Sequence, residues 1–271
     1  MQSNHPRTGV RIAMIDMRKI NLESLNSATK YPSIVTFHER DPKRGMLTEK
    51  PIDTFAGNVL LTEKVDGTGT RIVAFPNGDY IIGSREHLLH ARGDLVANLT
   101  DGVVETLRPV ADALWTPGSG TQVVVLYLEV YGGNIGRNAS QYTGNGRTGF
   151  RMFDAAAVPG SVLVRTPAEA ASWREDGGQN FLTEQELQDM AVRQGIGLTP
   201  RLGMLPASEV PTGIEEMHAF LTSRIPETNV ALDADAGRIP EGIVLRTEDR
   251  SVIAKARLQD YANTLRRRSG R

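Results

Sequence analysis

Residues 61–71, which read L-T-E-K-V-D-G-T-G-T-R, join an apolar run to a lysine and a glycine-rich turn. The apolar residues 59–61 predict a buried strand that ends close to the lysine. Lys64 lies between two acids, Glu63 and Asp66, and two glycines follow within five residues. A lysine at this place has two interpretations. Either it forms ordinary salt bridges at the end of a strand, or it is a nucleophile that forms a covalent bond.

The segments around this stretch predict an α+β fold. Residues 71–75 and 79–83 flank Pro76-Asn77-Gly78, which predicts a hairpin turn. Apolar and β-branched residues predict further strands at 122–130, 150–155, 241–246 and 252–257. Periodicity and capping residues, including Thr100 and the box formed by Thr183 and Glu186, predict helices at 98–115, 183–193, 213–223 and 258–268. Hairpin strands with helices interspersed are typical of antiparallel α+β sheets and not of a doubly wound parallel sheet. The Pro- and Gly-rich stretches near 116–120 and 158–178 are expected to be surface loops.

The composition predicts a folded protein without a strong overall charge. The chain has 271 residues, of which 39% are hydrophobic and 23% charged, and its formal net charge is −1. A polyanion would therefore need a local basic patch, for which residues 137–151 and Arg266-Arg267-Arg268 are candidates, although a solvated loop and a frayed end explain them equally well. The absence of cysteine excludes disulfides and thiolate sites. With no apolar signal core and no apolar run near ~18 residues, a cytoplasmic protein without membrane contact is expected.

Lys64 needs a lowered pKa to act as a nucleophile. An ordinary lysine has a pKa near ~10.4, so only about one side chain in 2,500 is neutral at pH 7. Burial and neighbouring cations lower the pKa of a lysine, whereas carboxylates raise it. The strand before Lys64 supplies burial. Lys255 and Arg257, two residues apart on a predicted strand, supply cations on one strand face.

Two glutamates are predicted on strands where an unpaired carboxylate is costly. Glu129, in Y-L-E-V-Y-G-G, shares its strand face with apolar residues, which favours a functional partner. Glu241 opens E-G-I-V-L-R, and the tight turn that follows places it across from residues 255–257 to within one residue of register. A cross-strand salt bridge is the structural alternative there. Because carboxylate oxygens together with phosphate favour Mg²⁺, both glutamates are candidate metal ligands, and no Walker A motif is present to cradle a phosphate.

The order of these elements resembles the covalent nucleotidyltransferases, which include RNA ligases, ATP-dependent DNA ligases and mRNA-capping guanylyltransferases. Lys64 in K-V-D-G is similar to their K-x-D-G element, whose lysine carries the nucleotide. The resemblance also implies a nucleotide or 5′-phosphate contact for Arg85, a ribose contact for Glu129, base stacking for Phe153 or Phe150, metal and lysine contacts for Glu241, and an α-phosphate contact for Lys255. It places Glu63, Asp66, Gly67, Arg71 and Arg257 among the nucleotide-binding residues, with Asp66 shaping the turn rather than acting as a base. Residues 30–39, K-Y-P-S-I-V-T-F-H-E, are similar to the N-terminal segment of RNA ligases of the RNA ligase 2 type.

The resemblance implies an ATP-dependent RNA ligase with a nucleotidyltransferase domain, similar to the ATP-grasp fold, of antiparallel sheets flanked by helices. Lys64, Glu241 and Lys255 would be catalytic. Lys64 would form lysyl-AMP from ATP with Mg²⁺ or Mn²⁺, AMP would pass to an RNA 5′-phosphate, and an RNA 3′-hydroxyl would displace it. Residues 1–50 would form an N-terminal extension packed on the core, and residues 51–271 the adenylylation domain, with a helical elaboration around 156–240.

Departures from the family pattern leave alternatives open. Gly69 replaces a frequent asparagine, and Arg257 replaces a frequent lysine. Only ~14 residues follow Arg257, too few for an OB domain, so a protein partner would supply the missing substrate-binding domain. The alternatives are a DNA ligase or capping-type guanylyltransferase, which usually carries an OB domain, and a nucleotide- or RNA-binding module that has lost catalysis.

Overall fold

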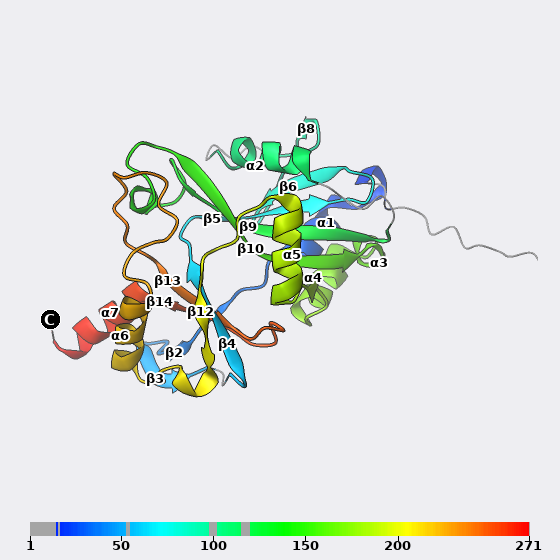
Figure 1. Cartoon of the computed structure of the whole chain (residues 1–271). Helices are drawn as coiled ribbons and strands as arrows, with labels where there is room; N and C mark the ends of the chain where they lie inside the picture. Colours follow the sequence, from blue (N-terminus) through cyan, green and yellow to red (C-terminus); the bar gives the residue numbers. More distant parts are fainter. Residues whose placement is uncertain (1–14, 16, 53–54, 98–101, 115–119, 271) are drawn as a thin grey trace, which may run out of the picture.

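The computed structural model describes residue 15 and residues 17–52, 55–97, 102–114 and 120–270. The chain has the α+β fold that the sequence predicts, with a five-stranded sheet, a seven-stranded sheet and helices packed on both (Figure 1). The predicted helix cap Thr100, residues 116–119 of a predicted loop and the N-terminal residues 1–14 lie outside the described residues. Within the described ranges, none of the helices combines the length and the apolar character that crossing a bilayer requires.

The five-stranded sheet contains the strand that ends in Lys64. Its strands, in spatial order, are β1 (Val35–Thr36), β14 (Ile253–Arg257), β13 (Gly242–Arg246), β4 (Asn58–Lys64) and β12 (Arg201–Pro206). Neighbouring strands are antiparallel except for β1, which pairs with β14 in parallel. Gly242 pairs with Lys64 on one side and with Arg257 on the other. The lysine end of β4 and the start of β13 therefore lie beside the end of β14, which agrees with the predicted position of Glu241 to within one residue.

The seven-stranded sheet carries Glu129 and the strand that follows the lysine turn. Its strands, in spatial order, are β11 (Asn180–Phe181), β10 (Thr148–Pro159), β9 (Gln122–Gly132), β5 (Thr68–Ala74), β6 (Tyr80–Ser84), β7 (Leu88–Ala91) and β8 (Asp94–Leu95). Glu129 of β9 lies opposite Gly69 of β5 and Arg151 of β10. Alternate apolar residues of β9 belong to two separate hydrophobic clusters, which confirms the predicted alternation of its faces.

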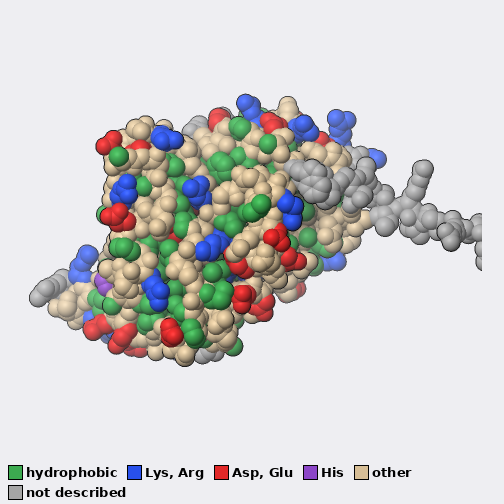
Figure 2. Space-filling view, in the orientation of Figure 1, with side chains coloured by type: hydrophobic (Ala, Val, Ile, Leu, Met, Phe, Trp, Pro, Cys, Tyr) green, Lys and Arg blue, Asp and Glu red, His purple; other side chains and the backbone are tan. Residues whose placement is uncertain are grey.

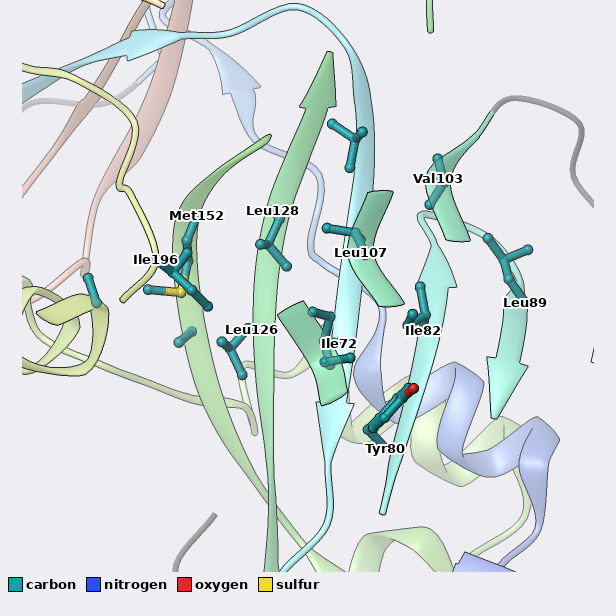
Figure 3. Packing of buried hydrophobic residues seen from close by; sticks show 14 of the residues in the cluster. Ile72, Tyr80, Ile82, Leu89, Val103, Leu107, Leu126, Leu128, Met152 and Ile196 are labelled. Carbon is teal, nitrogen blue, oxygen red and sulfur yellow. The ribbon is translucent and has the colours of Figure 1, made fainter. Parts of the chain in front are cut away.

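Helices cover both faces of the seven-stranded sheet. α2 (Val103–Ala113) and α5 (Glu184–Gln194) pack on one face, where Leu107 joins the cluster of strand residues drawn in Figure 3. On the other face lie α1 (Leu22–Thr29), α3 (Gly160–Leu163) and α4 (Pro167–Glu175). α6 (Ile214–Arg224) and α7 (Leu258–Arg268) pack on the five-stranded sheet. The short elements are β2 (His38–Arg40), β3 (Leu47–Pro51) and the 3₁₀ turns η1 (Met17–Lys19), η2 (Ala139–Gln141) and η3 (Ala207–Glu209).

Residues 158–178 form the end of β10 and two helices, so the surface loop expected from their composition is wrong. Thr166 caps α4, because its hydroxyl accepts the Glu169 N–H while the Glu169 carboxylate accepts the Thr166 N–H. Pro167 occupies the first helical turn, where no N–H is needed. Proline and glycine content therefore concealed a capping box, whereas the box at Thr183 opens α5 as predicted.

His38 of β2 is buried between α7 and the residues that precede α6. Its Nε2 lies 2.8 Å from the carbonyl oxygen of Thr212, and its Nδ1 lies 2.8 Å from the hydroxyl of Tyr261. Because a carbonyl only accepts, Nε2 carries the hydrogen, and the neutral ring accepts from the tyrosine at Nδ1. Burial lowers the pKa of His38, although the Thr212 carbonyl opposes this effect.

We expect the free energy of unfolding to fall as the pH drops below about 6.5, because the unfolded chain then binds a proton at His38 that the folded chain excludes. Above that pH this contribution is fully present, since His38 is neutral in both states. Urea unfolding across this pH range measures the slope. His38→Gln should flatten it, whereas the exposed His87→Gln should not. Equal slopes for the wild type and His38→Gln would contradict the assignment.

Candidate active site

A cavity of about 590 Å³ lies between the two sheets. β4, β13 and β14 line one side, and β5, β9 and β10 line the other. Residues 31–34 of the N-terminal segment and residues 84–87 after β6 complete the wall. The volume lies within the range of small-molecule sites. Most of the residues singled out in the sequence line it, namely Glu63, Lys64, Asp66, Gly67, Arg71, Arg85, Glu129, Phe153 and Lys255.

Lys64 points toward Glu241, which begins the neighbouring strand. The Nζ atom of Lys64 lies 2.5 Å from Oε2 of Glu241, and the two side chains are 23% and 16% exposed. A pair so enclosed is less screened than a surface salt bridge. The two residues are therefore brought together as predicted, with Lys64 in the cavity lining and Glu241 beside it, outside the lining.

The residues around Lys64 fix the position of its backbone. The carboxylate of Glu63 accepts hydrogen bonds from the Thr228 hydroxyl and from the Asn229 N–H at 2.9 Å. Val65 is buried in a small cluster with Tyr131, Tyr142 and Val230. Glu63 and Val65 thus anchor the chain on both sides of the lysine. Glu63 was predicted to bind the nucleotide, and in the structure its carboxylate is hydrogen-bonded to Thr228 and Asn229.

Asp66 and Gly67 shape the turn after the lysine. The N–H of Asp66 donates to the Tyr142 hydroxyl at 2.6 Å, and Asn138 Nδ2 donates to the Asp66 carboxylate at 2.5 Å. Gly67 packs directly on the backbone of β9, since a Cβ there would lie 2.2 Å from the Val130 carbonyl oxygen. Sequence reasoning missed Tyr142 and Asn138, because nothing local in the sequence shows that they reach this turn.

We expect Gly67→Ala to lower the free energy of unfolding by about 1–3 kcal/mol, because the added methyl group must displace β9. Gly69→Ala is the matched control, since its Cβ would meet only the Glu129 carboxylate, at 3.7 Å. Its effect should stay below about 0.5 kcal/mol or be stabilising, because alanine suits a strand better than glycine. Urea unfolding of both variants measures the difference. If Gly67→Ala lowered the free energy of unfolding as little as Gly69→Ala, the turn would tolerate a side chain at residue 67.

Two carboxylates near the lysine have raised pKa values because they are buried. Burial raises the pKa of Glu129 to about 8, and the Glu241 and Asp66 carboxylates add to this effect while Lys64 opposes it. Burial likewise raises the pKa of Glu241, against the pull of Lys64. A bound cation would remove this cost by holding both groups ionised. Glu129 and Glu241 therefore fit a divalent ion, although no group of three or more His, Cys, Asp or Glu side chains forms a metal site within the described chain.

Lys255 and Arg85 bring positive charge to the cavity. Burial lowers the pKa of Lys255, and the nearby cations Lys64, Arg257 and Arg85 lower it further. Arg85 is 61% exposed at the rim, where Nη2 donates to the Ser33 hydroxyl at 2.9 Å. Arg257 shares a strand face with Lys255 as predicted, but it lies outside the cavity lining and pairs with Asp260 at 2.9 Å.

Arg71 supports the loop that carries Arg85. Its Nη1 donates to the carbonyl oxygens of Ser84 at 2.6 Å and Arg85 at 3.0 Å, and its Nη2 donates to Asn26. Burial lowers the pKa of Arg71 to about 10, so the side chain stays cationic at neutral pH. Arg71 was predicted as a nucleotide contact. Its bonds show that it positions the backbone on which the exposed Arg85 is carried.

Aromatic rings form the inner wall of the cavity. Of the two phenylalanines considered for base stacking, Phe153 lines the cavity, whereas Phe150 packs in the hydrophobic cluster on the other side of the sheet. Tyr31 lines it as well and meets Phe153 edge to face, with ring centroids 5.0 Å apart. Sequence reasoning did not single out Tyr31. The only signal for it was its place in the K-Y-P-S segment.

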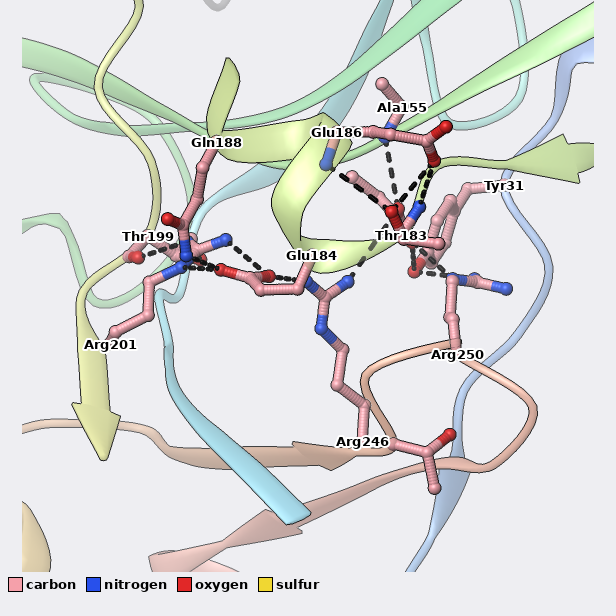
Figure 4. A network of polar contacts seen from close by, with 12 residues as sticks. Tyr31, Ala155, Thr183, Glu184, Glu186, Gln188, Thr199, Arg201, Arg246 and Arg250 are labelled. Atoms are coloured by element: carbon pink, nitrogen blue, oxygen red, sulfur yellow. Dashed lines mark hydrogen bonds and ion pairs between the residues drawn. The ribbon is translucent and has the colours of Figure 1, made fainter. Parts of the chain in front are cut away.

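A buried ionic network joins the two sheets behind these rings (Figure 4). Asp154 of β10 is fully buried and accepts hydrogen bonds from the Tyr31 hydroxyl, at 2.8 Å, and from Arg250 Nε. Arg246 of β13 lies 3.9 Å from Asp154 and pairs with Glu184 of α5. Arg201 of β12 binds the same glutamate at 2.9 Å. Both walls of the cavity are thus linked through charged groups, of which Asp154 and Arg246 are almost fully buried.

Comparison with known proteins bears on both the fold and the family. A search of curated protein sequences gave no match. Solved structures of Naegleria gruberi RNA ligase share the fold: a mutant with ATP and Mn (TM-score 0.51, 15% identity), the enzyme with PPi (0.50, 16%) and a mutant with AMP and Mn (0.51, 16%). These alignments cover 86–89% of this chain but 62–64% of those proteins, so the chain spans less than two thirds of their length. The family model described as RNA ligase matches residues 57–257, well over half of the chain. The chain therefore belongs to the RNA ligase family.

Proposed function

We propose that the protein is an ATP-dependent RNA ligase in which Lys64 carries AMP as a covalent adduct. The observation that carries this proposal is the 2.5 Å contact between Glu241 and Lys64, which lines a cavity together with Glu129, Lys255 and Arg85. This arrangement offers a nucleophile, a proton acceptor and phosphate-binding cations in one place.

In the first step the Lys64 amine would attack the α-phosphorus of ATP. A P–N bond forms, and the bond from the α-phosphorus to the pyrophosphate oxygen breaks. The attacking amine must first lose a proton. Glu241, whose carboxylate lies against the amine, would accept it. Burial raises the pKa of this carboxyl, which makes it a better proton acceptor.

The other lining residues would bind the nucleotide. Lys255 and Arg85, which both line the cavity, would bind the phosphates. Because strands already hold most of the site in position, its side chains would stabilise the charge of the transition state without first having to rearrange. Phe153 and Tyr31 offer ring faces and edges to the base. Mg²⁺ or Mn²⁺ would be held by Glu129 and Glu241 and would neutralise phosphate charge. Glu129, which lines the cavity, would also contact the ribose.

The later steps would join RNA ends. AMP passes from Lys64 to an RNA 5′-phosphate, giving an RNA–adenylate with a new pyrophosphate linkage. An RNA 3′-hydroxyl then attacks that 5′-phosphate, the phosphodiester forms and AMP leaves. A partner protein would contribute further substrate-binding surface. A cytoplasmic location remains a prediction.

Labelling tests the proposal. The protein is incubated with Mg²⁺ and α-labelled ATP or GTP, separated on a denaturing gel, and the labelled peptide is mapped. Label from ATP on the peptide that contains Lys64 supports adenylylation, and subsequent sealing of 5′-phosphate RNA but not DNA supports RNA ligation. Label from GTP would indicate a capping-type enzyme, and sealing of DNA alone a DNA ligase. ATP binding without label would indicate a module that has lost catalysis.

A further inference from the structure

A second group of cations lies outside the cavity, where the β2–β3 loop meets the last turn of α7. We call it the basic face; its members are all exposed and comprise Arg40, Lys43, Arg44, Arg266, Arg267 and Arg268. The two segments are joined directly, because Arg267 Nη1 donates to the Arg44 carbonyl oxygen at 2.9 Å and Arg268 pairs with Glu49 of β3. Residues more than 200 apart in sequence therefore build one surface.

The loop of the basic face has a fixed shape. The Asp41 carboxylate accepts the N–H groups of Lys43 at 2.8 Å and Arg44 at 3.1 Å. Arg40 Nη1 donates to the Gly45 carbonyl oxygen at 2.7 Å, and Gly45 has a φ of +66° that suits glycine. In the described part of the chain, the side chains of Lys43, Arg44 and Arg266 make no ion pair or hydrogen bond. The three side chains are therefore exposed cations outside the ion pairs of this face, and Arg44 is close enough to Asp41 to interact with it electrostatically.

The basic face concentrates charge in a protein that has almost none overall. Its six cations are accompanied by three acids, Asp41, Glu49 and Asp260, which leaves a local charge of about +3 against −1 for the whole chain. Basic and acidic side chains are interspersed over the molecular face shown in Figure 2. Arginines at the end of α7 also suit the helix dipole. The dipole does not explain Lys43 and Arg44, which lie on a loop.

The basic face is continuous with the cavity. Asp260 binds Arg40 at 3.0 Å and Arg257 at 2.9 Å, and Arg257 shares a strand face with the cavity residue Lys255. α7 begins where β14 ends and leads outward to the C-terminus (Figure 1). The nine residue steps from Leu258 to Arg267 span about 14 Å. Lys255, Arg257 and Arg40 therefore connect the cavity to the basic face, with Asp260 bridging the two arginines.

We infer that the basic face binds the phosphodiester backbone of the RNA strand whose end enters the cavity; this inference rests on the proposed function. At about 3.4 Å per nucleotide along one strand, 14 Å corresponds to about four nucleotides next to the reacting end. Cations that contact phosphates release counterions from the nucleic acid, so binding through this face depends on salt and not on base sequence.

The test uses the full chain and a 5′-phosphorylated, 3′-fluorescein-labelled RNA of about 20 nucleotides, with binding followed by fluorescence anisotropy over a range of salt concentrations. The variant is Lys43→Gln/Arg44→Gln/Arg266→Gln, which removes the three unpaired charges and none of the bonds that fix the loop. The control is Arg108→Gln/Arg165→Gln/Arg193→Gln, which removes three exposed charges elsewhere. We expect the Kd for RNA to rise about tenfold or more in the variant, and the slope of log K against log salt to become shallower by about 2, near 0.7 per lost phosphate contact. The control should match the wild type.

Labelling by ATP separates this inference from the proposed function. Lys64 should be labelled equally in the wild type and in the triple variant, because none of the three residues lines the cavity. The inference is overturned if the wild type does not bind RNA, if Kd and slope are unchanged in the variant, or if the control loses as much. A wild type that takes no label but loses RNA affinity in the variant would reject ligation and keep the basic face.

Discussion

Lys64→Ala should abolish covalent labelling by ATP, by about a thousandfold or more, while the protein stays folded. Among the described residues, Lys64 and Lys255 are the lysines that line the cavity, and of these two only Lys64 pairs with a carboxylate, so Lys255 is not placed to replace the nucleophile. The loss of the ion pair should cost no more than about 1–2 kcal/mol, because Glu241 is enclosed but can take up a proton, a change that burial already favours. Gel labelling and urea unfolding measure the two effects.

The control for this variant is Lys50→Ala. Lys50 is 72% exposed and pairs with Glu39 on the surface at 2.6 Å, so its removal should leave both label and stability within error. Label retained in Lys64→Ala would reject the nucleophile. Collapse of the fold in that variant would instead make Lys64 a structural residue.

Asp154→Ala should be the most destabilising single substitution considered, with a loss of about 3–5 kcal/mol in the free energy of unfolding. Asp154 is fully buried and accepts hydrogen bonds from Tyr31 and Arg250, with Arg246 nearby. Its removal takes a carboxylate partner away from the largely buried guanidinium groups of Arg246 and Arg250. Urea unfolding gives the change directly.

Two further variants distinguish the charge from the shape of this side chain. Asp154→Asn keeps an acceptor of the same size and should fall between the wild type and the alanine variant. Asp249→Ala removes an exposed carboxylate from the turn that carries Arg250, and should cost about 1 kcal/mol or less. A loss below about 1 kcal/mol in Asp154→Ala would show that the network contributes little to stability.

The sequence predicts the fold class and seven of the strands, β4, β5, β6, β9, β10, β13 and β14, because these depend on local patterns, and a short turn sets the register that brings Glu241 near Lys255. It misses the other described strands, of which β12 is the longest. It fails at α3 and α4, where glycine and proline obscured the Thr166 cap. It also misses Tyr31, Tyr142 and Asp154. Each of these acts through partners distant in sequence, such as Asp154 with Tyr31, 123 residues away, and no local pattern encodes such contacts.

The pairing of Lys64 with Glu241, 177 residues later, has a consequence for synthesis on the ribosome. Lys64 is synthesised first, and its carboxylate partner Glu241 and Lys255 follow only after most of both sheets has been made. A nascent chain that stops before β13 therefore holds Lys64 without its carboxylate partner. If the proposed function holds, such a chain should take no label from ATP.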